Sequence, residues 1–266
     1  MNRALRDFRS LESIAAQTSA LSELDARAKI LATFGFLLTV VSFDRYTVAA
    51  LLPLVLFPVV LMHMGNIPLR VIGRGILLAS PLAIMMGMFN PLFDHQVMAV
   101  VAGYGVSAGW LSFASILLRF ALTVSAGLVL VAGTGFNPLC DGLRRLGFPE
   151  VFTNQLLLLH RYALVLTDET TRMSLARELR ANGKSLSLSV YGPLLGHLLL
   201  RAMQRAQRIH QAMLSRGFTG SLQRDSSLRW QRRDTLFLGA CVLGFGVARR
   251  FDLAQLIGLA MVGLAR

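Results

Sequence analysis

Charged residues are scarce in this chain: they make up 15% of its 266 residues, whereas a soluble domain usually carries about 25%. Apolar residues make up 54% and gather in long blocks rather than in the stripes of a soluble amphipathic helix. Helices that are apolar all round suit lipid, where every backbone polar group must be satisfied within the protein. The composition therefore excludes an ordinary soluble protein and indicates an integral membrane protein.

Cysteine and closely spaced histidines are also lacking. Cys140 and Cys241 are the only cysteines, and they support neither a disulfide framework nor a zinc motif. None of the five histidines has another histidine three or four residues away, the spacing that places two ligands on one helix face. We therefore expect no metal site and no cofactor in this chain.

Acidic residues are outnumbered by basic ones, 14 to 27, and the formal net charge is +13. The segment from Asn137 to Asp234 holds 15 of the basic residues and 7 of the acidic ones. Cytoplasmic segments of membrane proteins are enriched in arginine and lysine. This rule accounts for the charge without nucleic acid, which we do not expect as a partner, and it predicts a cytoplasmic location for residues 137–234.

Four apolar blocks precede the basic segment, and a bilayer of ~30 Å needs roughly 20 helical residues for each span. The blocks are Ile30–Phe43, Thr47–Met64, Ile72–Phe89 and Val97–Gly135. The first three fit one span each. The fourth is too long for one span and contains several glycines, so we expect a short external element followed by a span over Leu111–Ala132.

Two shorter apolar stretches follow the basic segment, Thr235–Ala248 and Leu253–Ala265. Arg249 and Arg250 separate them, and a single helix would bury each arginine in lipid at a cost of roughly 2.5–3.5 kcal/mol. Two short spans are therefore favoured. This predicts about six spans in all, with five as the alternative.

The predicted fold is an all-α integral membrane protein in three parts. Residues 1–136 contain an N-terminal amphipathic helix, which is too polar for a signal peptide, and the first four spans. Residues 137–234 form the cytoplasmic region, and residues 235–266 form a C-terminal transmembrane hairpin.

Two long helices are predicted within the basic segment, from Glu150 to Arg180 and from Leu186 to Arg216. Along the second, apolar residues recur at spacings of three and four, and arginine and glutamine occupy the opposite face. The apolar stripe consists of Leu195, Leu198, Leu199, Ala202, Ala206, Ile209 and Met213. A two-faced helix of this kind lies along a membrane surface or against a partner and does not cross the bilayer.

The two predicted helices end in the same pattern: an alanine, three further residues, an arginine and a small residue. These residues are Ala176, Arg180 and Ala181 in the first helix and Ala212, Arg216 and Gly217 in the second. Ordinary capping is one interpretation, because a cation near a helix C-terminus contributes ~0.3–1 kcal/mol through the helix dipole. The repetition of the pattern after 36 residues also fits a matched pair of docking tips.

At these two ends the chain resembles the twin Ala-Arg-Gly signatures of the transmembrane coupling subunits of energy-coupling-factor (ECF) transporters. Leu179-Arg180-Ala181 takes the place of the first signature and Ser215-Arg216-Gly217 that of the second. The first departs from the family pattern, because alanine and not glycine follows Arg180. Further residues look closer to the cobalt-type member, CbiQ: Arg161, Tyr162, Glu169 and Arg172. The segment Leu24–Lys29 is similar to the one before that family's first span.

The resemblance implies two crossing coupling helices whose arginine tips enter grooves on two cytoplasmic ATPase subunits. The residues implied in this coupling are Ala176, Arg180, Ala181, Ala212, Ser215, Arg216 and Gly217, supported by Arg161, Tyr162, Glu169 and Arg172. It also implies a separate substrate-binding membrane subunit, cobalt(II) as the substrate, and a bacterial cytoplasmic membrane with the N-terminus inside.

Other functions remain open. The same type of subunit could serve nickel or a vitamin such as biotin, because the substrate binds to a partner. A stand-alone secondary transporter or a membrane enzyme would need buried acid pairs or a catalytic cluster, and we find neither pattern. Gly183-Lys184-Ser185 resembles the end of a phosphate loop, but Glu178 occupies the position of its first glycine. We therefore expect no enzymatic activity in this chain.

Arg119 lies inside the fourth predicted span, and an ionisable residue there is by default a functional candidate. Two partners are considered, a carboxylate of another subunit and a lipid phosphate. Gly73, Gly75 and Gly87 suggest a surface for a partner subunit, with ordinary lipid-facing sequence as the alternative.

Overall fold

The computed structural model describes residues 19–44, 48–93, 97–101, 104–181, 191–220 and 230–250. The predicted N-terminal helix, the segment Gly183–Ser185 and the predicted last span lie outside these residues. The described residues form two compact units. The first comprises the residues up to Gly142 together with Trp230–Arg250, and the second runs from Leu143 to Gly220.

The first unit consists mainly of helices that coincide with the apolar blocks. In chain order they are α2 (Ala26–Ser42), α3 (Val48–Leu51), the 3-10 helix η1 (Leu52–Val55), α4 (Leu56–Met64), α5 (Leu69–Gly87), α6 (Asn90–Phe93), α7 (Ala108–Thr134) and α11 (Arg232–Arg250). Helix α8 (Phe136–Arg145) leads from the first unit into the second. Pro53 lies in η1, where its missing N–H interrupts the α-helical hydrogen bonds of the second block.

The described elements are helical apart from one short hairpin, so the all-α class is confirmed. Strands β1 (Val97–Val101) and β2 (Tyr104–Ser107) pair antiparallel, with Val97 opposite Ser107. They occupy the part of the fourth block where a short external element was expected. Three valines in β1 favour a strand because β-branched side chains fit the pleated backbone.

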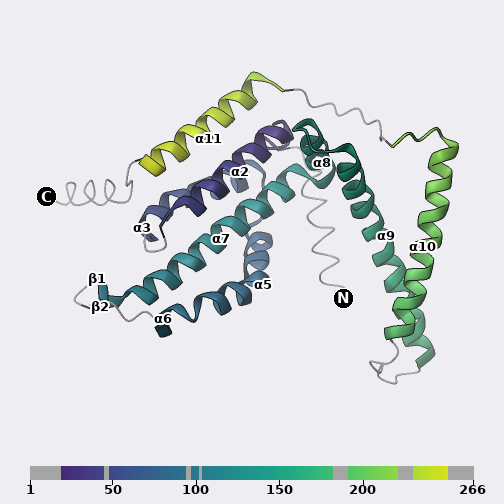
Figure 1. Ribbon diagram of the computed structural model, residues 1–266, viewed down its shortest axis with the longest axis horizontal. Coiled ribbons are helices and arrows are strands. Elements are labelled where there is room, and N and C mark those ends of the chain that lie inside the picture. The colour runs from purple at the N-terminus through teal and green to yellow at the C-terminus, as the bar shows by residue number, and fades with distance from the viewer. Residues whose placement is uncertain are drawn as a thin grey trace. The chain divides into compact units, whose positions relative to one another are not determined.

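Helix α7 is the centre of the first unit and packs against α2, α4 and α5 (Figure 1). Four of its buried residues belong to two apolar clusters. One includes Phe36 of α2 with Leu122 and Ala126 of α7, and the other includes Ile72 of α5 with Val129 of α7.

Glycines bring α5 and α7 close together. A Cβ atom at Gly75 would lie 2.4 Å from Cδ1 of Leu128, and one at Gly87 would lie 2.7 Å from Cδ2 of Phe113. Of the three glycines that suggested a partner surface, these two therefore contact a helix of their own chain. A Cβ at Gly73 would have no neighbour within 4 Å.

The outer face of α5 is unusually apolar. Leu77, Leu78 and Met86 are 72%, 86% and 73% exposed, whereas soluble monomers rarely expose continuous apolar patches of this kind. Among the described helices, α5 and α7 are long and apolar enough to cross a bilayer. Helix α2 is 17 residues long, Val48–Met64 forms a shorter apolar helix, and α11 carries charges at both ends. The count of six spans stays a prediction.

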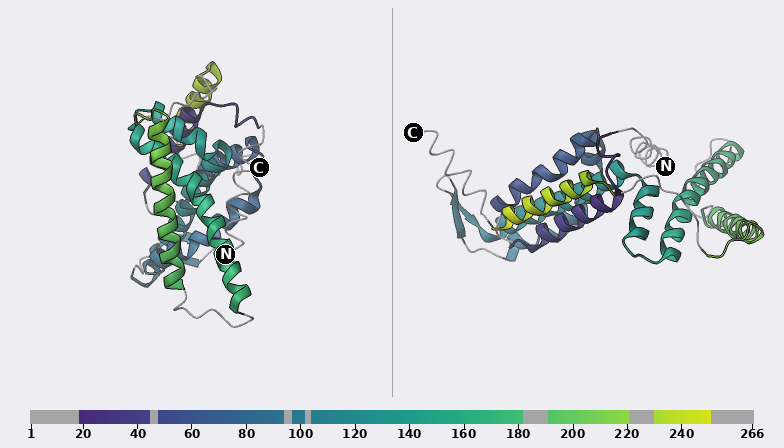
Figure 2. Two further views of the ribbon diagram at one scale, coloured as in Figure 1. Left: turned by 90° about the vertical axis from the view of Figure 1, so that its right-hand side faces the viewer. Right: turned by 90° about the horizontal axis from the view of Figure 1, so that it is seen from above.

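Helices α2 and α11 run parallel, side by side (Figure 2). At their first turns the backbone N–H of Asp25 donates to Oδ1 of Asp234 over 2.8 Å. At their last turns Cζ of Arg249 lies 5.0 Å from the ring centroid of Phe43. The two helices therefore begin at the same end of the unit.

Arg119 has a different partner from the two considered. Its Nη2 donates a hydrogen bond to the backbone carbonyl of Asp44, just beyond the end of α2. Asp44 directly follows Phe43, the C-cap residue of α2. The arginine therefore ties α7 to the end of α2 within the chain itself.

The second unit consists of α9 (Glu150–Ala181) and α10 (Tyr191–Ser215), together with the end of α8. The prediction of two long helices is confirmed. The second was expected to begin at Leu186, which lies outside the described residues.

Candidate coupling surface

Helices α9 and α10 contact each other at an angle and run in opposite directions (Figure 1, Figure 2). Near the start of α9, Nδ2 of Asn154 donates to the backbone carbonyl of Gly220, just beyond the end of α10, over 3.0 Å. Further along, Arg201 of α10 forms an ion pair with Glu169 of α9. The C-terminal ends of the two helices, which carry the predicted tips, therefore lie at opposite ends of the pair.

The separation of the tips follows from helix geometry. Arg180 lies 26 residues after Asn154, which is ~39 Å along α9 at 1.5 Å per residue. The carbonyl of Gly220, four residues after Arg216, binds Asn154, so the end of α10 lies near the start of α9. The two arginines therefore lie at opposite ends of the pair, an arrangement that suits two separate contacts.

A glycine-dependent cap ends α10. Gly217 has φ +77°, and its N–H donates to the carbonyl of Leu214 over 3.0 Å. The N–H of Phe218 donates to the carbonyl of Met213 over 3.0 Å. These bonds form a Schellman motif, in which a left-handed residue closes the last turn. Arg216 is exposed immediately before the glycine.

Helix α9 ends in a run of exposed side chains. Ala176, Arg177, Glu178, Leu179 and Arg180 are all exposed. Leu179 is an apolar side chain that is 75% exposed. The end of α9 therefore presents a cation next to an apolar surface, and arginine is enriched at protein interfaces.

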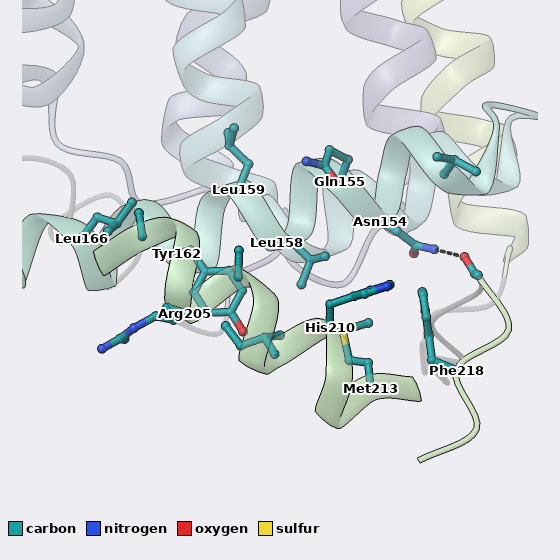
Figure 3. Close-up of a pocket in the computed structure, with 15 residues that line it drawn as sticks. Asn154, Gln155, Leu158, Leu159, Tyr162, Leu166, Arg205, His210, Met213 and Phe218 are labelled. Carbon is teal, nitrogen blue, oxygen red and sulfur yellow. Dashed lines mark hydrogen bonds between the residues drawn. The ribbon is translucent and has the colours of Figure 1, made fainter. Parts of the chain in front are cut away.

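An open apolar groove of about 540 Å³ lies between the two helices (Figure 3). Its α10 wall is the C-terminal half of the predicted apolar stripe, formed by Ala202, Ala206, Ile209 and Met213. In the N-terminal half, Leu195 and Leu199 are each 63% exposed. Helix α9 thus covers only part of the stripe.

The four supporting residues of the first helix separate into two pairs. Tyr162 lines the groove and Glu169 binds Arg201, so these two face α10. Arg161 and Arg172 are exposed. The predicted coupling residues Ala212 and Ser215 are exposed on α10, and Ser215 Oγ donates to the carbonyl of Gln211. The side chain of Ala181 lies outside the description, although the residue ends α9.

Three residues of this surface were missed in the sequence. Asn154 joins α9 to the end of α10, and His210 and Phe218 line the groove with Met213 (Figure 3). Asn154 interrupts an apolar stretch, which is a signal for a polar contact. Phe218 follows Gly217 at the position where Schellman motifs carry an apolar residue that packs back on the helix.

The chemistry of the described surface is dominated by arginine side chains. Nowhere in the described residues are three His, Cys, Asp or Glu side chains grouped so that they could hold a metal ion. What the surface offers is guanidinium groups, which present a planar fork of donors to carboxylates and carbonyls.

Comparison with known proteins identifies relatives over most of the chain. The family model for the cobalt transport protein CbiQ matches residues 17–227. The energy-coupling factor transporter transmembrane protein EcfT of Staphylococcus aureus is 26% identical over 239 residues, which cover 83% of this chain and 88% of that protein. An uncharacterized protein of Methanocaldococcus jannaschii is 26% identical over 206 residues, covering 71% of this chain and 74% of its own length.

Proposed function

This chain belongs to the cobalt transport protein family CbiQ and is the transmembrane component of an ECF transporter. We propose that it transmits ATP-driven motion between the subunits of that transporter. In this proposal two cytoplasmic ATPases supply the motion, and a separate substrate-binding membrane subunit receives it. The family is one of membrane transport components and not of catalytic enzymes. Hydrolysis of ATP is therefore assigned to the partners.

The observation that carries the proposal is the position of Arg180 and Arg216 at opposite ends of one antiparallel helix pair. Both are exposed, and both lie at the C-terminal end of a helix. A guanidinium group keeps its charge when a partner desolvates it. Two such tips, at opposite ends of the helix pair, suit one contact on each of two ATPase subunits.

The tips are also fixed to stiff elements. Helix α9 has 32 residues and α10 has 25, and the Asn154–Gly220 hydrogen bond and the Glu169–Arg201 ion pair cross-link them. In this proposal, a displacement of one tip therefore moves both helices, because the tips are attached to helices and not to flexible loops. Motion of ATPase subunits at the two tips would tilt the helices together.

Cobalt(II) is the proposed substrate, because the matching family is described as a cobalt transport protein family. The alternative is the same subunit serving nickel or a vitamin such as biotin, since the substrate would bind to a partner. We also propose a bacterial cytoplasmic membrane with the N-terminus in the cytoplasm, from the charge of residues 137–234.

The test is Arg216→Glu in the complex produced together with its ATPases and substrate-binding subunit. Truncating one partner of a buried charge pair typically costs about 2–5 kcal/mol, so the ATPases should be lost on purification and ATP-driven Co²⁺ uptake should fall to background. Arg208→Glu is the matched control, because it reverses the same charge at an exposed position within α10. Retention of the ATPases and of uptake in Arg216→Glu would refute the docking role.

A further inference from the structure

The first turn of α2 contacts both chain connections of the second unit. That unit is joined to the first by two connections, one through α8 and one that ends at Trp230 and continues into α11. Any force that the second unit exerts through the chain must pass along these two connections. Where each is held on the first unit therefore matters for coupling.

Helix α8 contacts α2 through Gly142, which is buried. A Cβ atom at Gly142 would lie 2.9 Å from Cβ of Ala26 and 3.0 Å from Cδ1 of Ile30. Real Cβ atoms are essentially never found closer than 3.0 Å to such neighbours. The connection through α8 is therefore seated directly against the first turn of α2.

The other connection is bonded to the same turn by Asp234, which is 2% exposed. Its Oδ1 accepts from the backbone N–H of Asp25 over 2.8 Å, and its Oδ2 accepts from the backbone N–H of Gln231 over 2.7 Å. The second bond caps the start of α11, where unpaired N–H groups favour a carboxylate. One side chain thus begins α11 and ties it to α2.

Further polar contacts strengthen this attachment. Asp25 Oδ2 accepts from Arg27 Nη2 over 3.2 Å, and Cζ of Arg27 lies 5.4 Å from the ring centroid of Trp230. Lys29 is 4% exposed, donates from Nζ to the carbonyl of Leu21 over 3.0 Å, and interacts electrostatically with Asp25 and Asp234. Buried charges persist only when they are paired and hydrogen-bonded, so each member depends on the others.

A neighbouring ion pair differs from the buried contacts of Asp234 because it is exposed to solvent. Arg233 and Glu23 are 3.2 Å apart with side chains 74% and 69% exposed. Exposed pairs of this kind contribute little to stability. The two residues next to each other in α11, Arg233 and Asp234, therefore make very different contributions to the attachment.

We propose that Asp25, Arg27, Lys29, Trp230 and Asp234, here called the α2 anchor, form the point at which movement of the coupling helices is transferred to the membrane helices. The inference rests on the proposed function. Helix α2 packs against α7 and α11, so a displacement of its first turn reaches the centre of the first unit. The anchor residues act as positioning residues, because they hold α2 and α11 in register and touch no substrate.

The first test is Asp234→Asn in the full complex reconstituted in liposomes, with Co²⁺ uptake and ATP hydrolysis measured on the same sample. Asparagine keeps the shape and one acceptor but removes the charge and the second acceptor. Hydrogen bonds to charged groups are strong enough that we expect a fall of about tenfold in Co²⁺ transported per ATP hydrolysed. ATPase subunits should stay bound, because the tips are unchanged. Arg233→Ala is the control and should leave the ratio as in the wild type.

The second test keeps all charges. Gly142→Ala forces α8 away from α2 and should lower the same ratio. The double variant Gly142→Ala with Ala26→Gly moves the methyl group from one helix to the other, and so should restore the ratio. Gly127→Ala is the control, since a Cβ at Gly127 in α7 has no neighbour within 4 Å.

The outcomes separate this inference from the proposed function. A wild-type complex without ATP-driven uptake would refute the proposed function and the anchor with it. With an active wild-type complex, equal losses of hydrolysis and uptake in Asp234→Asn would show a structural role only and would overturn the anchor alone. Failure of Ala26→Gly to restore Gly142→Ala would also overturn it.

Discussion

Replacing Gly217 with alanine tests whether the left-handed turn holds the end of α10 in place. At φ +77° the Cβ of an alanine comes too close to the backbone, which raises the free energy of this conformation by about 1–2 kcal/mol. Apart from the adjacent residues of the chain, no atom lies within 4 Å of a Cβ built there, so no packing term adds to or offsets this cost. The hydrogen bonds from Gly217 to Leu214 and from Phe218 to Met213 should therefore open about 5–30 times more often.

Hydrogen exchange of the purified complex, followed by mass spectrometry of peptides covering residues 208–220, measures this opening. The Gly217→Ala variant should exchange faster in these peptides by the same 5–30-fold factor. Gly217→Asn should lie between alanine and the wild type, because asparagine tolerates the left-handed region better.

Two further glycines provide matched controls. Gly196 lies within α10 with open space around it, so Gly196→Ala should slow exchange in α10, by the roughly 0.5–1 kcal/mol that alanine contributes within a helix. Gly147 ends α8 in the same motif, with φ +99°, and Gly147→Ala should speed exchange there and leave α10 unchanged. Unchanged exchange at residues 208–220 in Gly217→Ala, or an asparagine variant as fast as alanine, would refute the reasoning.

Two other perturbations test the packing of each unit. Gly75→Ala places a methyl group 2.4 Å from Cδ1 of Leu128 and should destabilise the first unit by about 1–3 kcal/mol, seen as a lower midpoint of thermal unfolding in detergent. Gly73→Ala, which meets no neighbour within 4 Å, should raise the midpoint slightly, and equal midpoints for the two variants would contradict the close contact. Asn154→Ala removes the 3.0 Å bond to the carbonyl of Gly220 and should cost about 0.5–1.5 kcal/mol. Faster exchange at residues 150–160 and 215–220 would show it, and unchanged exchange in both peptides would argue against the cross-link.

The helices of the basic segment were predictable because their signals are local. Glu150–Ala181 begins directly after Pro149 and shows no internal breaker. The small residue of the second pattern, Gly217, follows the end of α10 with φ +77°, a conformation that glycine adopts readily. Such features depend on a few neighbouring residues, so they can be predicted from the sequence.

Other features depend on pairs of residues that are distant along the chain. Arg119 was expected to seek a partner outside the chain, yet it binds the carbonyl of Asp44, 75 residues away. No local sequence pattern indicates that Asp234 binds the first turn of α2, 209 residues earlier. Helical spacing shows which face a residue occupies but not which helix will lie opposite.

The amino-acid sequence by itself determined the class of protein, the long helices and their arginine ends, because hydropathy, periodicity and capping act over distances of a few residues. The tertiary structure decided the antiparallel arrangement of α9 and α10, the glycine contacts between α5 and α7, and the buried contacts that join α2 to α8 and α11. These depend on close packing and on the pairing of buried polar groups. Both are properties of residues brought together only when the chain folds.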